Sequence, residues 1–124
     1  MAKSKKKLSA KKKLPEPPKF YSDFLKKYPE IGSAYEKMGD AVHSGGPLTA
    51  RERALVKLAI SGSHLFHSAF KSHIRKAIAA GISRDEIEHI ALLTLPTVGF
   101  PTMMAMMGII EDQISTPEEH KKKR

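Results

Sequence analysis

Apolar side chains recur every three or four residues over most of the chain from Phe20 onward, which is the period of one face of an α-helix. No segment alternates apolar and polar residues with a period of two, so the pattern predicts no strand. Proline and glycine divide the pattern into short pieces with short connections. The chain is therefore expected to be all-α, a compact bundle of about six helices.

Three positions carry the signals of helix starts. Pro29 suits the first turn of a helix, where its missing backbone N–H costs nothing. Thr49 with Glu52, and Ser83 with Glu86, have the spacing of a capping box, in which each side chain bonds the other residue's backbone N–H. We therefore expect helices to begin at these three places.

Helix ends are marked mainly by glycine. The segment 44–47 (SGGP) ends one helix, and Gly81 ends another because glycine adopts the left-handed conformation at little cost. A further interruption is predicted at Gly62 and Ser63, with Ser63 capping a helix over residues 64–80. The last helix is expected to begin near Pro101.

The residues from Ile90 to Ile110 are all uncharged, a run as long as a membrane-spanning helix. Pro96, Gly99 and Pro101 interrupt its middle, and proline disrupts a helix interior. We therefore predict two helical pieces that pack in a protein core instead of one membrane span.

The second of these pieces is rich in methionine, a residue whose flexible side chain suits helix–helix interfaces. Four methionines surround it: Met103, Met104, Met106 and Met107. Together with the many apolar side chains on short helices, this predicts a homo-oligomer. The alternative is that the methionines fill the core of a monomer.

The net charge of +9 belongs to the two ends of the chain. Residues 1–19 carry eight lysines and one glutamate, residues 116–124 carry four basic and two acidic residues, and residues 20–115 carry ten of each. We therefore predict a disordered lysine-rich arm over 1–19, a helical domain over 20–115 and a basic tail over 116–124. The arm could hold nucleic acid weakly, or serve only as a solvated tail. No apolar signal segment is found, which predicts a cytoplasmic protein.

The chain has no cysteine, which excludes disulfides, thiolate metal sites and thiol redox chemistry. Among its six histidines, His73 shares a helical stripe with Phe66, Ala69 and Phe70. A histidine in this setting is either a core side chain bonded to a carbonyl or a proton-transfer group that faces a pocket.

A metal site is the less favoured use of the remaining histidines. His64 and His67 are three residues apart and could share a face, but no acidic residue lies at a matching spacing on that helix. Zinc would need a third ligand from another helix, such as His89. We therefore predict no metal, and no other cofactor.

The chain resembles the carboxymuconolactone decarboxylase family, which includes the alkylhydroperoxidase D-like proteins, in five segments: 48–55 (LTARERAL), 73–77 (HIRKA), 80–83 (AGIS), 85–87 (DEI) and 99–101 (GFP). The resemblance covers about residues 20–115. It implies an all-α bundle that assembles as dimers, trimers or hexamers.

The peroxidase branch of that family uses a C-x-x-C pair and a glutamate that relays protons. The C-x-x-C pair of that branch lies at a fixed spacing before the histidine that matches His73. By this spacing the two cysteine positions fall on Phe66 and Ala69. The glutamate position falls on Ala54. Phenylalanine and alanine can neither attack a peroxide nor form a disulfide. The resemblance therefore excludes a thiol peroxidase of that type.

The decarboxylase branch needs no cysteine, and it implies a cofactor-free enzyme that acts on a small carboxylate-bearing lactone or keto acid. His73 would transfer the proton, and Arg53, Arg75 or Lys76 would hold the carboxylate, unless Arg75 and Lys76 are only surface charges. The turn of Gly99, Phe100 and Pro101 would lie near the pocket. The alternative is a non-catalytic oligomer that binds a ligand or a partner. In that reading Phe66 and Ala69 fill the vacated thiol site beside His73.

Overall fold

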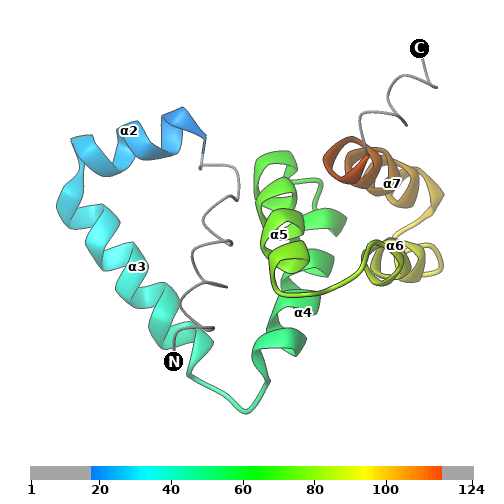
Figure 1. The fold of residues 1–124 in the computed structure, drawn as a ribbon, viewed down its shortest axis with the longest axis horizontal. Helices are drawn as coiled ribbons and strands as arrows, with labels where there is room; N and C mark the ends of the chain where they lie inside the picture. The colour runs from blue at the N-terminus through cyan, green and yellow to red at the C-terminus, as the bar shows by residue number, and fades with distance from the viewer. Residues whose placement is uncertain (1–17, 116–124) are drawn as a thin grey trace, which may run out of the picture. The chain divides into compact units, whose positions relative to one another are not determined.

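The computed structural model describes residues 18–115, and these fold as helices joined by turns (Figure 1). The helices are α2 (Lys19–Lys27), α3 (Pro29–His43), α4 (Ala50–Ser63), α5 (His67–Ala79), α6 (Arg84–Leu93) and α7 (Phe100–Ile114). Over this part of the chain the all-α prediction is confirmed. The predicted basic tail, and the arm up to residue 17, lie outside the described residues. The chain divides into two compact units, residues 1–53 and 54–124, which are described separately below.

The first unit is built on the hairpin of α2 and α3. Pro29 stands in the first turn of α3 as predicted, and Tyr28 is the residue between the two helices. The helices meet where Leu25 lies against Gly32, since a Cβ atom added at Gly32 would come within 2.6 Å of the Leu25 Cδ2. Gly32 is the one buried residue among those described in this hairpin.

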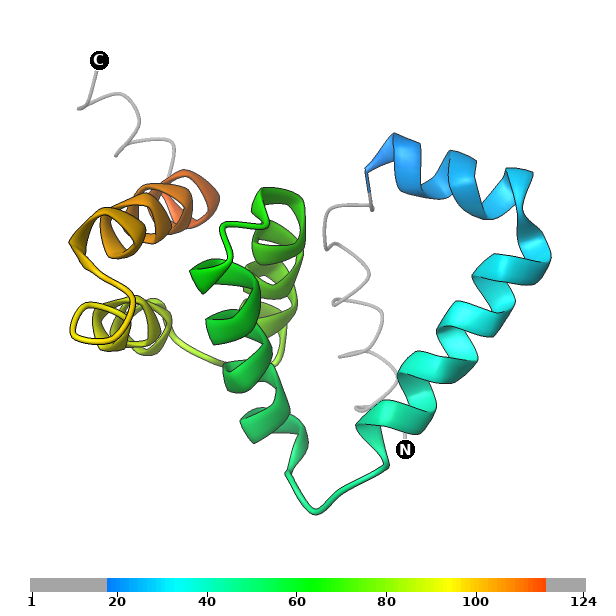
Figure 2. The same cartoon turned by 180° about the vertical axis from the view of Figure 1, so that it is seen from behind.

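The second unit holds an apolar core to which helices α4, α5, α6 and α7 all contribute side chains. Figure 2 shows these helices from behind. The buried side chains of the core are Leu58, Phe70, Ile74, Ala77, Ile82, Ile87, Ala91, Met106, Ile109 and Ile110. Helix α4 passes close to two other helices at Gly62, where an added Cβ would lie 2.5 Å from the Met106 Cε and 2.8 Å from the Phe70 ring. Glycine is therefore needed at this crossing because the backbone itself packs against side chains.

A helix break is present, but it lies at residues 64–66, after Gly62 and Ser63, and the prediction that Ser63 caps the next helix is wrong. Helix α4 continues through both residues, and Ser63 donates a hydrogen bond back to the carbonyl of Ile60 instead of capping α5. The turn comes at Leu65, whose φ of +55° is left-handed. The Leu65 N–H bonds the Gly62 carbonyl and the Phe66 N–H bonds the Ser61 carbonyl. This is the bond pattern of a glycine-terminated helix, with leucine in the glycine position.

The other predicted helix boundaries are confirmed. Gly81 ends α5 with a φ of +91°, and the next residue, Ile82, is buried in the core. Ser83 and Glu86 form the expected capping box at the start of α6. Thr49 and Glu52 form the second one: the Thr49 N–H donates to the Glu52 Oε1 and the Glu52 N–H donates to the Thr49 Oγ1, with nitrogen–oxygen distances of 2.8 and 3.1 Å.

The long uncharged run forms the end of α6, a turn, and most of α7. None of the helices over residues 18–115 has the length and apolar character needed to cross a bilayer. Met103 and Met106 lie in the core of their own unit, as the monomer alternative expected, whereas Met104 is exposed.

Candidate functional site

Helix α5 places His73 on a face beside the core. Phe70, Ile74 and Ala77 fix the helix because they are buried. His73 and Ala69 are half-buried and lie one turn apart. Phe66 is the N-cap residue directly before α5. The structure therefore places Ala69 and His73 one turn apart on α5, with Phe66 at the start of that helix.

The contacts of Phe66 differ from those expected of a side chain that fills a vacated thiol site. Its ring stacks on His64, with centroids 5.2 Å apart and planes 10° from parallel. It is also 56% exposed. Because more than half of its surface meets solvent, Phe66 does not close a dry cavity beside His73, and that expectation is wrong.

The two predicted arginines are used elsewhere. The Arg75 Nη1 donates to the Gln113 side-chain oxygen at 3.4 Å, which joins α5 to α7. Arg75 lies two residues after His73, so the two side chains leave the helix in nearly opposite directions. The Arg53 Nη1 donates to the carbonyl of Leu48 at 2.7 Å and closes the loop before α4 within the first unit.

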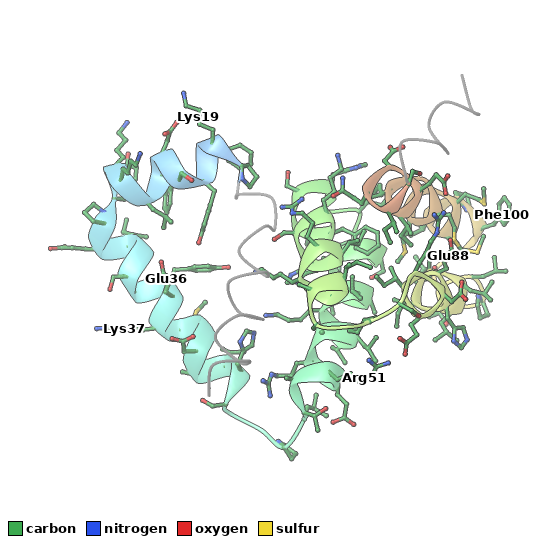
Figure 3. All side chains as sticks on the ribbon, in the orientation of Figure 1. Lys19, Glu36, Lys37, Arg51, Glu88 and Phe100 are labelled. Atoms are coloured by element: carbon green, nitrogen blue, oxygen red, sulfur yellow. The ribbon has the colours of Figure 1, made fainter. Side chains whose placement is uncertain are left out.

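The predicted turn near the pocket begins α7. Gly99 is the N-cap residue with a φ of +119°, and Pro101 stands in the first turn. Phe100 is 59% exposed. Figure 3 shows its side chain at the outer edge of the α6–α7 pair, pointing away from α5. Within one chain the structure therefore does not bring Phe100 to His73.

The three histidines considered as metal ligands lie on different elements. His64 stacks on Phe66, His67 begins α5, and His89 lies exposed on α6. Over residues 18–115 no three His, Cys, Asp or Glu side chains come together in a way that could hold a metal ion.

A charged cluster that the sequence analysis missed joins α6 to α7. The Arg84 Nε contacts the Glu88 Oε2 at 2.9 Å, and the Arg84 guanidinium also pairs with Glu111. Glu88 lies between the two helices (Figure 3). The spacing of four residues could have revealed the Arg84–Glu88 pair, but no local signal points to Glu111. All three side chains are about one-third exposed, which is typical of a stabilising surface network.

Capping also changes the electrostatics of one carboxylate. The backbone N–H of Thr49, followed by its hydroxyl, lowers the pKa of Glu52 because both donate to the charged carboxylate.

Comparison with known proteins agrees with this architecture. The family model of the carboxymuconolactone decarboxylase family matches residues 29–112. An uncharacterized protein of Methanocaldococcus jannaschii is 28% identical over 86 residues, which cover 68% of this chain and 83% of the relative. No solved structure matches significantly. Because the family model covers more than half of the chain, the chain belongs to the carboxymuconolactone decarboxylase family.

Proposed function

We propose that this chain is a cofactor-free acid–base enzyme that acts on a small carboxylate-bearing lactone or keto acid. The observation that carries the proposal is the position of His73, half-buried on α5 one turn after Ala69. An imidazole can accept or donate a proton near neutral pH. Half-burial leaves it accessible to a substrate while the core holds the helix in place.

The proposed step is a proton transfer coupled to loss of carbon dioxide. When the carbon–carbon bond to the carboxylate breaks, its electron pair moves into the neighbouring carbonyl system and forms an enolate. The imidazolium of His73 then donates its proton to the enolate carbon, which completes the product and leaves neutral imidazole. The imidazole regains a proton from water before the next cycle.

The substrate carboxylate needs a cation on the same face as His73. Arg75 is a poor candidate because it leaves the helix on the other side and bonds Gln113. Lys76 lies three residues after His73, on the same side of α5, and its side chain is exposed. Lys76 is therefore the cation that we assign to this role, ahead of Arg53 and Arg75.

The test compares His73→Ala with His67→Ala, which removes an exposed histidine from the same helix. The two proteins and the wild type are screened for turnover of lactone acids and keto acids. Loss of a general acid should lower kcat by about 10²- to 10⁴-fold in His73→Ala, while His67→Ala should keep wild-type turnover. A substrate that His73→Ala converts at the wild-type rate would refute the mechanism.

The second candidate is a non-catalytic protein of the same fold that binds a small ligand, and the exposed ring of Phe66 favours it. An aromatic ring with half its surface in solvent, beside an imidazole, is an adaptable contact for a planar ligand. This candidate predicts a thermal shift with a planar acid, loss of that shift in Phe66→Ala, and no turnover. Turnover that depends on His73 would exclude it.

A further inference from the structure

The turn between α4 and α5 presents an aromatic ring to solvent. The Phe66 ring is 56% exposed and stacks on the imidazole of His64, with the ring planes 10° from parallel. Two contacts fix this turn: Leu65 packs against the core, and the Phe66 N–H bonds the Ser61 carbonyl. Leu65 has a left-handed φ of +55°, and backbone strain of this kind clusters at functional sites. The two rings therefore form a fixed, flat surface that is open to a planar group.

Helix α5, which begins directly after this ring, carries basic residues and no acidic ones. Its 13 residues include two histidines, two lysines and one arginine. Four polar side chains, which we name the α5 outer face, lie within an arc of about 100° on the side opposite the buried Phe70 and Ile74. They are Ser68, Lys71, Ser72 and Arg75, and none of them is fully buried. The face therefore offers two cations and two hydroxyl groups over about 10 Å of helix.

The α5 outer face is positively charged. Arg75 donates to the side-chain oxygen of Gln113 at 3.4 Å, and this oxygen belongs to a neutral amide, so the contact does not neutralise the guanidinium. Lys71 lies one turn before Arg75, and the two side chains leave the helix within about 40° of each other. The ion pairs described above lie on α6 and α7. Two neighbouring cations on a helix without acidic residues attract a polyanion.

We propose that the turn at Phe66 and the α5 outer face bind single-stranded nucleic acid. A nucleobase stacks on the exposed ring of Phe66. Lys71 and Arg75 contact the phosphates that follow this base, and the two serine hydroxyls of the face donate hydrogen bonds to phosphate oxygens. A duplex fits the site less well, because its bases are stacked inside the helix and do not reach the ring.

This inference goes beyond the proposed acid–base function, in which no residue of the α5 outer face transfers a proton. It shares only Phe66 with the second candidate function, whose small planar ligand needs no phosphate contact at Lys71. The eight lysines of residues 1–19 are expected to raise the affinity for any polyanion. Binding at α5 is distinguished from this general attraction by its dependence on a base and on Phe66.

The first experiment measures binding of the full-length protein to a short, unstructured RNA strand, and to the DNA strand of the same sequence, by fluorescence anisotropy. Phe66→Ala should weaken binding by about 5- to 150-fold, the range expected for the loss of one stacked base. Phe100→Ala removes a ring that is 59% exposed on α7 and should leave the affinity unchanged. Binding of either strand that depends on Phe66 supports the proposal. A wild type that binds neither strand at low salt, or equal affinities of the three proteins, would overturn it.

The salt dependence tests the phosphate contacts. Lys71→Gln should make the slope of log affinity against log salt concentration shallower by about 0.7, because one contact to a single-strand phosphate is lost. Lys37→Gln makes the same change of charge on α3 and should leave the slope unchanged. Inorganic polyphosphate has phosphates but no bases, so it should not distinguish the wild type from Phe66→Ala. Equal slopes for the two lysine variants, or an equal effect of Phe66→Ala on polyphosphate and RNA, would overturn the assignment to α5.

NMR of the wild type decides the matter if Phe66→Ala loses its helical circular dichroism. When the strand is added, the ring protons of Phe66 and His64 should shift upfield, because a stacked base shields them. The ring protons of Phe100 should keep their positions and serve as the reference. A bound strand that leaves the Phe66 signals unchanged would overturn the proposal.

Discussion

The α2–α3 hairpin and the α4–α7 unit carry similar apolar spacing in sequence but use it differently. In the hairpin the apolar side chains of one face of α3 are exposed, and Gly32 is the buried residue among those described. The exposed side chains are Ile31, Tyr35, Met38 and Val42. In the second unit, side chains at the same spacing are fully buried, as Phe70, Ile74 and Ala77 on α5 show. Periodicity tells which side chains share a face, but it does not tell whether the partner of that face lies in the same chain.

The strongest test of this comparison removes a large side chain from the core. Phe70 is fully buried, so Phe70→Ala should lower the free energy of unfolding by about 3–5 kcal/mol. Phe100→Ala removes the same group from a position that is 59% exposed in the same unit, and should cost less than about 1 kcal/mol. Urea unfolding followed by circular dichroism measures both. Equal losses would contradict the described core.

A matched pair of glycines compares the two regions directly. At Gly62 a new methyl group meets the buried Phe70 ring, which cannot move away, so Gly62→Ala should destabilise by about 1–3 kcal/mol. At Gly32 the new methyl group comes closest to the end of the Leu25 side chain, which is only half-buried and can rotate. Gly32→Ala should therefore change stability by less than about 1 kcal/mol, aided by the better helix propensity of alanine. Thermal unfolding of the two variants checks this order, and a larger loss at Gly32 would reverse the comparison.

The left-handed residues that follow α4 and α5, Leu65 and Gly81, are expected to give a smaller change in stability. Gly81→Ala forces a Cβ into a left-handed position and should cost about 1 kcal/mol. Leu65 already accepts that strain, and its partial burial against the core offsets it. Leu65→Gly should therefore relieve strain and lose packing, with a net change below that of Gly81→Ala. A clear gain in stability for Leu65→Gly, measured by urea unfolding, would show that its side chain contributes little.

The sequence predicted the fold where the signals were local. Pro29, Gly81 and the two capping boxes act within one turn of helix, so their residues alone determine where α3, α4, α5 and α6 begin or end. The error at Gly62 has the opposite origin. Its glycine is required by Phe70 and Met106, which come from other helices, and a contact of that kind is not visible from neighbouring residues.

The candidate site divides in the same way. The spacing of Ala69 and His73 predicts that they share a face, because both lie within α5, whereas Phe66 lies just before that helix. The resemblance implies that Arg75 could bind the substrate carboxylate. In the structure its guanidinium instead donates to Gln113, which lies 38 residues later in the chain. Spacing along α5 therefore indicates which residues lie near His73. Only the contact between α5 and α7 shows that Arg75 bonds Gln113.

The smallest expected effect concerns the pH dependence at the start of α4. The hydrogen bonds from Thr49 lower the pKa of Glu52 in the folded state, so the carboxylate contributes stability above its unfolded pKa and loses it as the pH falls through the lowered value. In Thr49→Gly the hydroxyl bond disappears while the backbone N–H remains, and the pKa of Glu52 should move part of the way back toward its ordinary value. NMR titration of the Glu52 carboxyl carbon measures this. Because Glu86 is capped in the same manner by Ser83, it serves as the internal reference that the substitution should leave unchanged. An unchanged Glu52 pKa would show that the Thr49 hydroxyl contributes nothing to its lowering.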